Sequence, residues 1–217
     1  MKKVLFISVL ALFTAGLVAA GTPKGTAIKG KAAKADTLKV NTTSSVVEWE
    51  GSKPLGKHNG TLKLKSGYLV VKGKNITAGS FDIDFTTLTD LDLTDAKTNQ
   101  MLIGHLSSPD FFDVKKYPVS VFKVTKVSTY TGKALADGSK PTHQVSGLLT
   151  IKDKTRAVTF AATINFSKDK VSASAPSFTI DRTDFDLRYG SKKFFDNLKD
   201  KSINDEIGLK ITLVAEK

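Results

Sequence analysis

The chain has 217 residues, of which 40% are hydrophobic and 25% are charged, so its length suits one domain and its composition excludes a wholly disordered protein. It contains no cysteine, which excludes disulfide scaffolds, iron–sulfur clusters, zinc–cysteine sites and a thiol nucleophile. The net charge is +12, and only three of the 33 basic residues are arginine. Because lysine lacks the rigid fork with which arginine recognises bases and phosphates, we expect no nucleic-acid partner.

The first 20 residues have the pattern of a signal peptide. Lys2 and Lys3 precede an almost uninterrupted apolar run, which ends in the small residues Val18, Ala19 and Ala20. This pattern predicts cleavage after Ala20 and a periplasmic or secreted protein. The alternative is an uncleaved membrane anchor, but the run lies at the lower limit of the roughly 17–25 residues that span a bilayer.

Residues 21–39 are expected to form a flexible basic linker. They contain five lysines and one acidic residue, Asp36, and no large apolar residue recurs at a helical or strand spacing. Such a segment is either a solvated leader or a weak contact to an anionic membrane surface. The folded domain is then expected over residues 40–217.

The remainder of the chain is dominated by strand patterns. Residues 81–85 read Phe-Asp-Ile-Asp-Phe, an alternation with a period of two that is typical of a strand with one buried face. Similar alternation recurs further along the chain, at residues 62–64, 119–121, 145–151, 158–166, 171–175 and 207–213. Turn signals lie between these runs, at residues 66–67, 131–132, 137–138 and 153–154.

This pattern predicts an all-β fold made of many antiparallel strands, which is either a sandwich or a closed barrel. The 13 phenylalanines, many of them at inward positions, favour an antiparallel β-barrel of about eight strands with an apolar interior.

Two short segments have helical rather than strand spacing. Residues 95–106 place Met101 on an apolar helical face, with Asp95 or Thr94 available as the N-cap. Residues 192–198 bring three apolar side chains onto one face in the same way. We expect one or two short helices that close an end of the barrel.

No catalytic, metal or cofactor site is predicted by the usual motifs. The histidines at 58, 105 and 143 lack the zincin spacing, and the nucleophile elbow, the phosphate loop and the dinucleotide fingerprint are absent from the sequence. His105 with Asp110 and Asp113 could hold a metal, but a structural histidine is the favoured interpretation.

The densest polar cluster is the stretch from Asp181 to Gly190. Arg182 or Arg188 could hold the polar head of a ligand with two hydrogen bonds. The alternative, which we favour, is that Arg182 pairs with an aspartate and closes one end of the barrel.

Three stretches carry a family resemblance: HLSSPDFFDVKKYP at residues 105–118, VSGLLTI at residues 145–151 with Thr155 and Val158 behind it, and IDRTDF at residues 180–185. Together they resemble the YceI-like family of exported proteins that bind lipids or polyisoprenoids. Asp186 stands where the family motif has glycine. The resemblance implies an extended, lipocalin-like barrel whose apolar channel holds an isoprenoid chain, such as a quinone or a polyprenyl lipid.

The resulting hypothesis is a non-enzymatic carrier for a long-chain isoprenoid or other apolar lipid, which uses no cofactor. Two alternatives stay open: a hydrolase or isomerase that uses His105 or the carboxylates of Asp181 and Asp184, and a ligand-free structural or stress-response envelope protein. Both a monomer and a homodimer are compatible with the sequence.

The channel is expected to be lined by large inward side chains and by small ones that leave room: Phe81, Ile83, Phe85, Phe112, Phe122, Phe160, Ala162, Ile164, Phe178, Ile207 and Leu209. Of the adjacent Phe111 and Phe112, at least one is expected to plug the barrel next to the helix that carries Met101 and Leu102.

Overall fold

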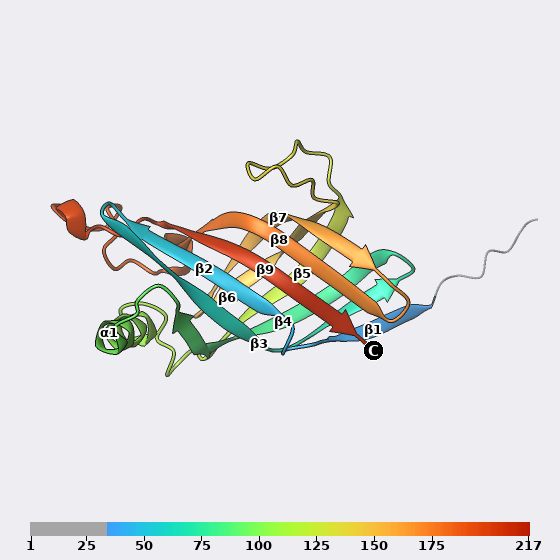
Figure 1. Ribbon diagram of the computed structural model, residues 1–217, viewed down its shortest axis with the longest axis horizontal. Coiled ribbons are helices and arrows are strands. Elements are labelled where there is room, and N and C mark those ends of the chain that lie inside the picture. Colours follow the sequence, from blue (N-terminus) through green and yellow to red (C-terminus); the bar gives the residue numbers. More distant parts are fainter. Residues whose placement is uncertain (1–33) are drawn as a thin grey trace, which may run out of the picture. The chain divides into compact units, whose positions relative to one another are not determined.

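The computed structural model describes residues 34–217, which form a nine-stranded antiparallel sheet with one α-helix (Figure 1). The strands are β1 (Ala35–Val40), β2 (Val46–Lys53), β3 (Gly56–Lys72), β4 (Asn75–Asp90), β5 (Val119–Thr129), β6 (His143–Ile151), β7 (Lys154–Phe166), β8 (Lys170–Asp181) and β9 (Glu206–Glu216). The helices are α1 (Ala96–Ser107) and two short 3₁₀ turns, η1 (Arg182–Phe185) and η2 (Lys199–Lys201). The predicted signal peptide and most of the predicted linker lie outside the described residues.

The sheet closes into a barrel because β3 pairs with β4 on one side and with both β1 and β2 on the other. Strands β1 and β2 share one position between β3 and β9: Val40 pairs with Ala215, and Val46 pairs with Thr212. Nine strands therefore occupy eight positions around the barrel. The all-β barrel confirms the predicted fold class.

The predicted linker ends too late, because its last five residues belong to β1. Ala35 pairs with Lys72 of β3, and the Leu38 side chain is buried in the barrel core. The apolar pattern of this strand is too short to be recognised from the sequence. It forms because β3 and β9 would otherwise leave unpaired backbone groups at this end.

A turn predicted at residues 66–67 is also wrong, because β3 runs straight through it. The pairing of β3 with β4 shifts register between Leu64 and Ser66, which is a β-bulge. Gly67 suits this position, because a Cβ atom there would lie 2.8 Å from the carbonyl oxygen of Ser80. The turn signals at 131–132 and 137–138 do lie between strands, and that at 153–154 covers the end of the β6–β7 turn and the first residue of β7.

The first predicted helix is confirmed, and the second is not. Helix α1 begins after Asp95, whose side chain accepts a hydrogen bond from the backbone N–H of Thr98 at 2.8 Å. Met101, expected to face the barrel, is 67% exposed. Residues 192–198 form a turn at 192–194 followed by irregular backbone instead of a helix, and Asn197 has a positive φ angle of 58°, which a right-handed helix does not allow.

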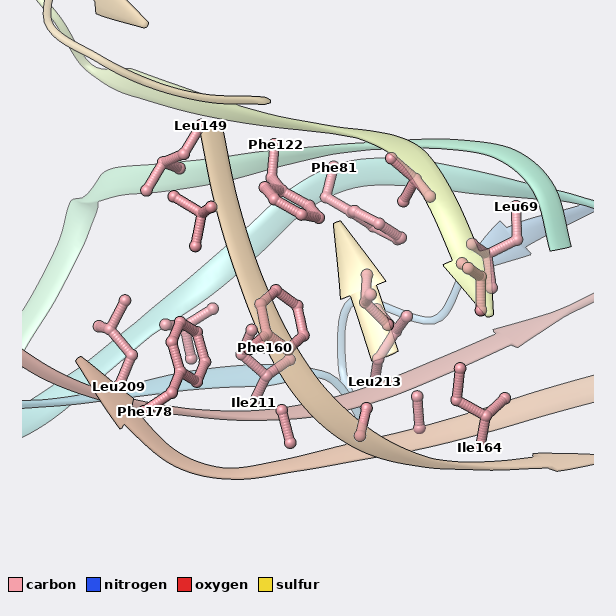
Figure 2. Close-up of a pocket in the computed structure, with 18 of the residues that line it drawn as sticks. Leu69, Phe81, Phe122, Leu149, Phe160, Ile164, Phe178, Leu209, Ile211 and Leu213 are labelled. Carbon is pink, nitrogen blue, oxygen red and sulfur yellow. The ribbon is translucent and has the colours of Figure 1, made fainter. Parts of the chain in front are cut away.

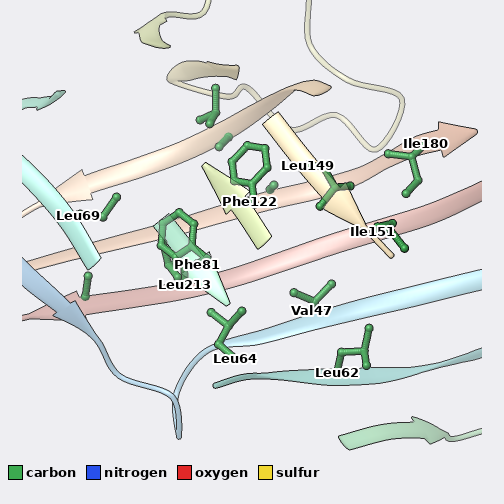
Figure 3. Close-up of a cluster of buried hydrophobic side chains, with 14 of the residues drawn as sticks. Val47, Leu62, Leu64, Leu69, Phe81, Phe122, Leu149, Ile151, Ile180 and Leu213 are labelled. Atoms are coloured by element: carbon green, nitrogen blue, oxygen red, sulfur yellow. The ribbon is translucent and has the colours of Figure 1, made fainter. Parts of the chain in front are cut away.

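The core is made of inward side chains from all sides of the barrel, as Figure 3 shows for Val47, Leu64, Phe81, Phe122 and Leu213. The inward faces predicted from the period-two alternation of β4, β7 and β9 are the buried ones. Within residues 34–217, no helix has the length and apolar character needed to cross a membrane.

Candidate functional site

Two adjoining cavities lie within the barrel. The inner cavity, of about 110 Å³, is lined by strand residues alone, whereas the outer cavity, of about 470 Å³, is also bordered by α1 and by the loop of residues 186–205. Val47, Ile83, Leu149 and Leu209 line both cavities, so the two meet inside the barrel. The outer volume falls within the range of roughly 300–1,000 Å³ that is usual for small-molecule sites.

The inner cavity has an entirely apolar lining that includes a row of aromatic rings (Figure 2). Phe81 lies 6.4 Å from Phe122, Phe122 lies 5.7 Å from Phe160, and Phe160 stacks on Phe178 at 4.5 Å between ring centroids. The four rings come from β4, β5, β7 and β8, so they follow the barrel wall.

Small side chains next to two of these rings along the same strands leave space in the cavity. Ala162, Ala173 and Ala175 line the inner cavity from β7 and β8. An apolar cavity of about 150 Å³ in another protein stays dry and accepts benzene. The inner cavity is of the same order, so it favours an apolar group over water.

The outer cavity combines an apolar floor with a polar rim. Trp49, Phe85 and Phe112 belong to the floor, and Phe85 and Phe112 contact each other at 4.6 Å between ring centroids. Lys53 and His58 are among the polar residues that border it. The hairpin between β2 and β3, helix α1 and the segment before β9 all lie at this end of the barrel (Figure 1).

Arg182 organises the loop at this rim. Its side chain is 1% exposed and donates hydrogen bonds to the carbonyl oxygens of four loop residues and to one carboxylate: Leu187 at 2.7 Å, Tyr189 at 2.9 Å, Asn204 at 3.0 Å, Ile203 at 3.1 Å and the carboxylate of Asp205 at 3.3 Å. Burial lowers the pKa of Arg182, and the carboxylates of Asp205 and Asp181 oppose that shift. The structural interpretation of Arg182 is therefore confirmed.

The other polar candidates have structural partners too. Asp181 accepts hydrogen bonds from the backbone N–H of Thr183 at 2.8 Å and from Lys193 at 2.5 Å. Burial raises the pKa of Asp181, but the hydrogen bonds from Lys193 and Thr183 outweigh burial and hold that pKa below its usual value. Arg188 pairs with Asp186 on the exposed surface.

His105 is packed between aromatic rings at the outer cavity. Its imidazole lies edge-on to Phe111 at 5.1 Å and to Tyr189 at 4.6 Å between ring centroids. Among residues 34–217, metal-ligand spacing is found not at His105, Asp110 and Asp113 but at His58, Asp90 and Asp92.

Every residue predicted to line the channel borders one of the two cavities. The inner cavity has Phe81, Phe122, Phe160, Ala162, Ile164 and Phe178; the outer one has Phe85, Phe112 and Ile207; Ile83 and Leu209 border both. That these residues contact a ligand stays a prediction.

Several lining residues were missed. Val47 and Trp49 could have been found, because they alternate with Glu48 and Glu50 in a strand pattern. Asn204 could not have been, because its place at the rim depends on hydrogen bonds from its backbone and side chain to Ser52 of β2.

The family follows from comparison with known proteins. A model of the YceI-like domain matches residues 38–215, which is most of the chain and includes the whole barrel except the first residues of β1 and the last of β9. The chain belongs to the YceI-like domain family. This YceI-like chain is also 46% identical over 61 residues to a UPF0312 protein of Pseudomonas putida strain W619, a stretch that spans 28% of either protein.

Two solved structures share the barrel fold of this YceI-like chain. BcnA of Burkholderia cenocepacia is 22% identical with a TM-score of 0.60, and the match covers 81% of this chain and 99% of BcnA. A polyisoprenoid binding domain from Saccharophagus degradans, described as implicated in plant cell wall breakdown, is 14% identical with a TM-score of 0.55. That match covers 86% of this chain and 99% of the other domain.

Proposed function

We propose that this YceI-like domain binds a long apolar lipid, such as an isoprenoid, quinone or polyprenyl chain, inside its barrel without reacting with it. The observation that carries the proposal is the pairing of an entirely apolar inner cavity with an outer cavity that has a polar rim. This polarity suits a ligand with a long apolar tail and a small polar head. The tail would point inward past Val47 and Leu209, and the head would stay at the rim.

The energetics are compatible with useful affinity. Burying roughly 400–500 Å² of apolar chain, at about 25 cal/mol per Å², stabilises a complex by about 10–12 kcal/mol before association costs are subtracted. Micromolar binding corresponds to about 8 kcal/mol. After an association cost of at least about 4 kcal/mol, about 6–8 kcal/mol remains at most, so burial of the chain alone gives micromolar or weaker binding.

The cavities and the partners of the polar residues favour lipid binding over a ligand-free structural role and over a reaction at the barrel mouth. A solidly packed structural barrel does not agree with cavities of about 110 and 470 Å³. For a reaction at the mouth, His105 is packed among aromatic rings, and Asp181 is engaged by Thr183 and Lys193. Because these side chains are already engaged by other groups of the protein, the site is better suited to binding than to a reaction.

The single tryptophan provides the test. Trp49 lines the outer cavity, so its fluorescence reports directly on a ligand that enters. Titration with farnesol, geranylgeraniol and solanesol is expected to change the emission saturably, with tighter binding as the chain lengthens. Hexanol, added as a matched short alcohol, is expected to leave it unchanged. Unchanged emission with every prenol, together with no lipid extracted from protein purified from its host, would refute the proposal.

Exchange of the lipid with a membrane is part of the proposal. Leu55 is 78% exposed in the β2–β3 hairpin, whose Lys53 and Gly56 border the outer cavity. Phe194 and Phe195 are 44% and 48% exposed in the loop of residues 186–205, which also carries Lys199 and Lys201 and borders that cavity. Apolar side chains with nearby lysines suit the surface of an anionic bilayer. Sedimentation with phosphatidylglycerol vesicles is expected to be weaker for Phe194→Ser/Phe195→Ser than for the parent; equal sedimentation would assign membrane contact elsewhere, such as the basic linker.

A further inference from the structure

We propose that His58, Asp90 and Asp92 form a binding site for a divalent transition-metal ion, with zinc as the expected ion, at the rim of the outer cavity. Each side chain offers one ligand atom, and these atoms all lie within 4.8 Å of one another. His58 also lines the outer cavity. The site is independent of lipid binding and adds a second ligand to the same end of the barrel.

The pairing of β3 with β4 brings the three residues together. His58 lies near the start of β3, and Asp90 is the last residue of β4. Gly60 pairs with Asp90, and beyond the end of β4 the backbone N–H of Leu91 still donates to the carbonyl oxygen of Asn59 at 2.9 Å. The backbone therefore sets the cluster without help from an ion.

Each carboxylate is anchored through one of its two oxygens. Oδ1 of Asp92 accepts a hydrogen bond from the backbone N–H of Asn59 at 2.8 Å. Oδ1 of Asp90 accepts one from the backbone N–H of Leu93 at 2.9 Å and one from the Asn99 side-chain amide at 3.2 Å. Hydrogen bonds of this kind orient the ligands of metal sites.

The second oxygen of Asp90 is the reason to infer an ion. Oδ2 of Asp90 is buried and has no hydrogen-bond partner, in a residue that is only 7% exposed. Oδ2 of Asp92 is hydrogen-bonded to Nδ1 of His58 at 2.9 Å, and an ion bound by both atoms would replace that hydrogen bond. A buried carboxylate oxygen without a partner costs free energy, and a cation held among the three ligand atoms removes that cost.

The ligand set also suits a particular class of ion. The imidazole nitrogen suits zinc and related transition metals, and zinc also accepts carboxylate oxygens, whereas calcium prefers oxygen ligands alone. Two zinc bonds of roughly 2.1 Å at a tetrahedral angle place their ligand atoms about 3.4 Å apart. The His58 and Asp92 ligand atoms, at 2.9 Å, would separate slightly, and ligand atoms as far apart as 4.8 Å would approach by about an ångström. Three protein ligands leave a fourth position for water or for a polar group in the outer cavity.

The test is calorimetric titration of the whole chain with zinc chloride after treatment with EDTA and desalting. We expect one zinc ion per chain and a melting temperature that rises with zinc. His58→Ala and Asp92→Asn are expected to weaken binding at least tenfold and to abolish the rise in melting temperature. Both side chains are partly exposed, so these variants are expected to fold, which circular dichroism checks.

His143→Ala is the matched control, because this histidine hydrogen-bonds to Thr142 and lies outside the cluster. It is expected to bind zinc as the parent does. Zinc binding that is absent from the parent at millimolar zinc, or that persists in both His58→Ala and Asp92→Asn, overturns the proposal. Equal loss in His143→Ala also overturns it, because the ion would then bind histidines unspecifically.

Discussion

At the scale of single residues, Arg182 shows how a buried charge can shape a site without contacting a ligand. Its guanidinium donates hydrogen bonds to the carbonyl oxygens of Leu187, Tyr189, Ile203 and Asn204. These residues lie towards the two ends of the loop beside the outer cavity. Arginine suits this role because its planar head presents several donors in fixed directions. The two ends of the loop are held together because these carbonyl groups bind to one guanidinium group.

We predict that Arg182→Met lowers the free energy of unfolding by about 3–5 kcal/mol, as expected when one partner is removed from a buried ionic network. The loss comes from carbonyl oxygens and the Asp205 carboxylate left without their donor. Urea denaturation measures it. Arg188→Met is the matched control, because its exposed pair with Asp186 contributes about 1 kcal/mol or less. If the two variants had equal midpoints of urea denaturation, Arg182 would not stabilise the fold more than Arg188 does, which would contradict the prediction.

Asp186 illustrates a conformational demand at one residue. It ends η1 with a φ angle of 62°, in the left-handed region that glycine adopts without steric cost. The resemblance to the family motif places glycine at this position, and the geometry explains why. Aspartate is tolerated because it is among the non-glycine residues most often found in this region.

At the scale of elements, β-bulges decide which side chains face the interior. In β8, Ala173 and Ala175 line the inner cavity, but the next residue that does so is Phe178, because the register with β9 shifts between Ala175 and Phe178. A shift of one residue exchanges the two faces of a strand. The bulge therefore allows both the small residues and Phe178 to point inward.

We predict that Ala162→Phe weakens binding of long prenols and leaves binding of farnesol nearly unchanged. Ala162 lines only the inner cavity, so a ring there blocks the far end of the channel but not the outer cavity. Trp49 fluorescence measures both affinities. Ala161→Phe is the matched control, because its side chain points to the other face of β7.

Thermal melting of the same Ala162→Phe variant separates blocking from over-packing. An inner cavity that accepts the ring leaves the melting temperature close to that of the parent, whereas over-packing costs roughly 1–3 kcal/mol. If the variant bound all prenols more weakly to the same extent, the inner cavity would not be the part of the channel that distinguishes long chains from short ones.

The two adjacent phenylalanines after α1 are predicted to differ in their effect on stability. Phe111 is 5% exposed, whereas Phe112 is half-buried against Phe85 at the outer cavity. Phe111→Ala is expected to lower the free energy of unfolding by about 3–5 kcal/mol, as for other buried aromatic side chains. Phe112→Ala is expected to cost less. Urea denaturation of both variants decides the order, and a larger loss for Phe112→Ala would reverse our assignment.

At the scale of the whole molecule, we propose that the chain is exported and cleaved after Ala20. Val18 and Ala20 present small side chains at the positions that signal peptidase recognises. N-terminal sequencing of protein from the envelope or medium of the native host is expected to begin at Gly21. An intact Met1 on that protein would instead indicate an uncleaved anchor.

Much of the barrel was predictable because its strands obey a local rule. The period-two alternation around Phe81, Phe160 and Ile207 is set by neighbouring residues, since successive side chains of any strand point to opposite faces. The N-cap at Asp95 is equally local. These patterns determined the fold class and placed the predicted lining residues inside the barrel.

Only the tertiary structure decided the features that depend on partners far away in the chain. Strand β1 exists because β3 and β9 offer it backbone partners, and residues 66–67 continue β3 because they still pair with Asp82 and Phe81 of β4 beyond the bulge. The cavity volumes depend on the summed side-chain sizes of all strands, and His58 meets Asp90 only through the pairing of β3 with β4. A local pattern determines which way a side chain points, but register and closure determine what it meets.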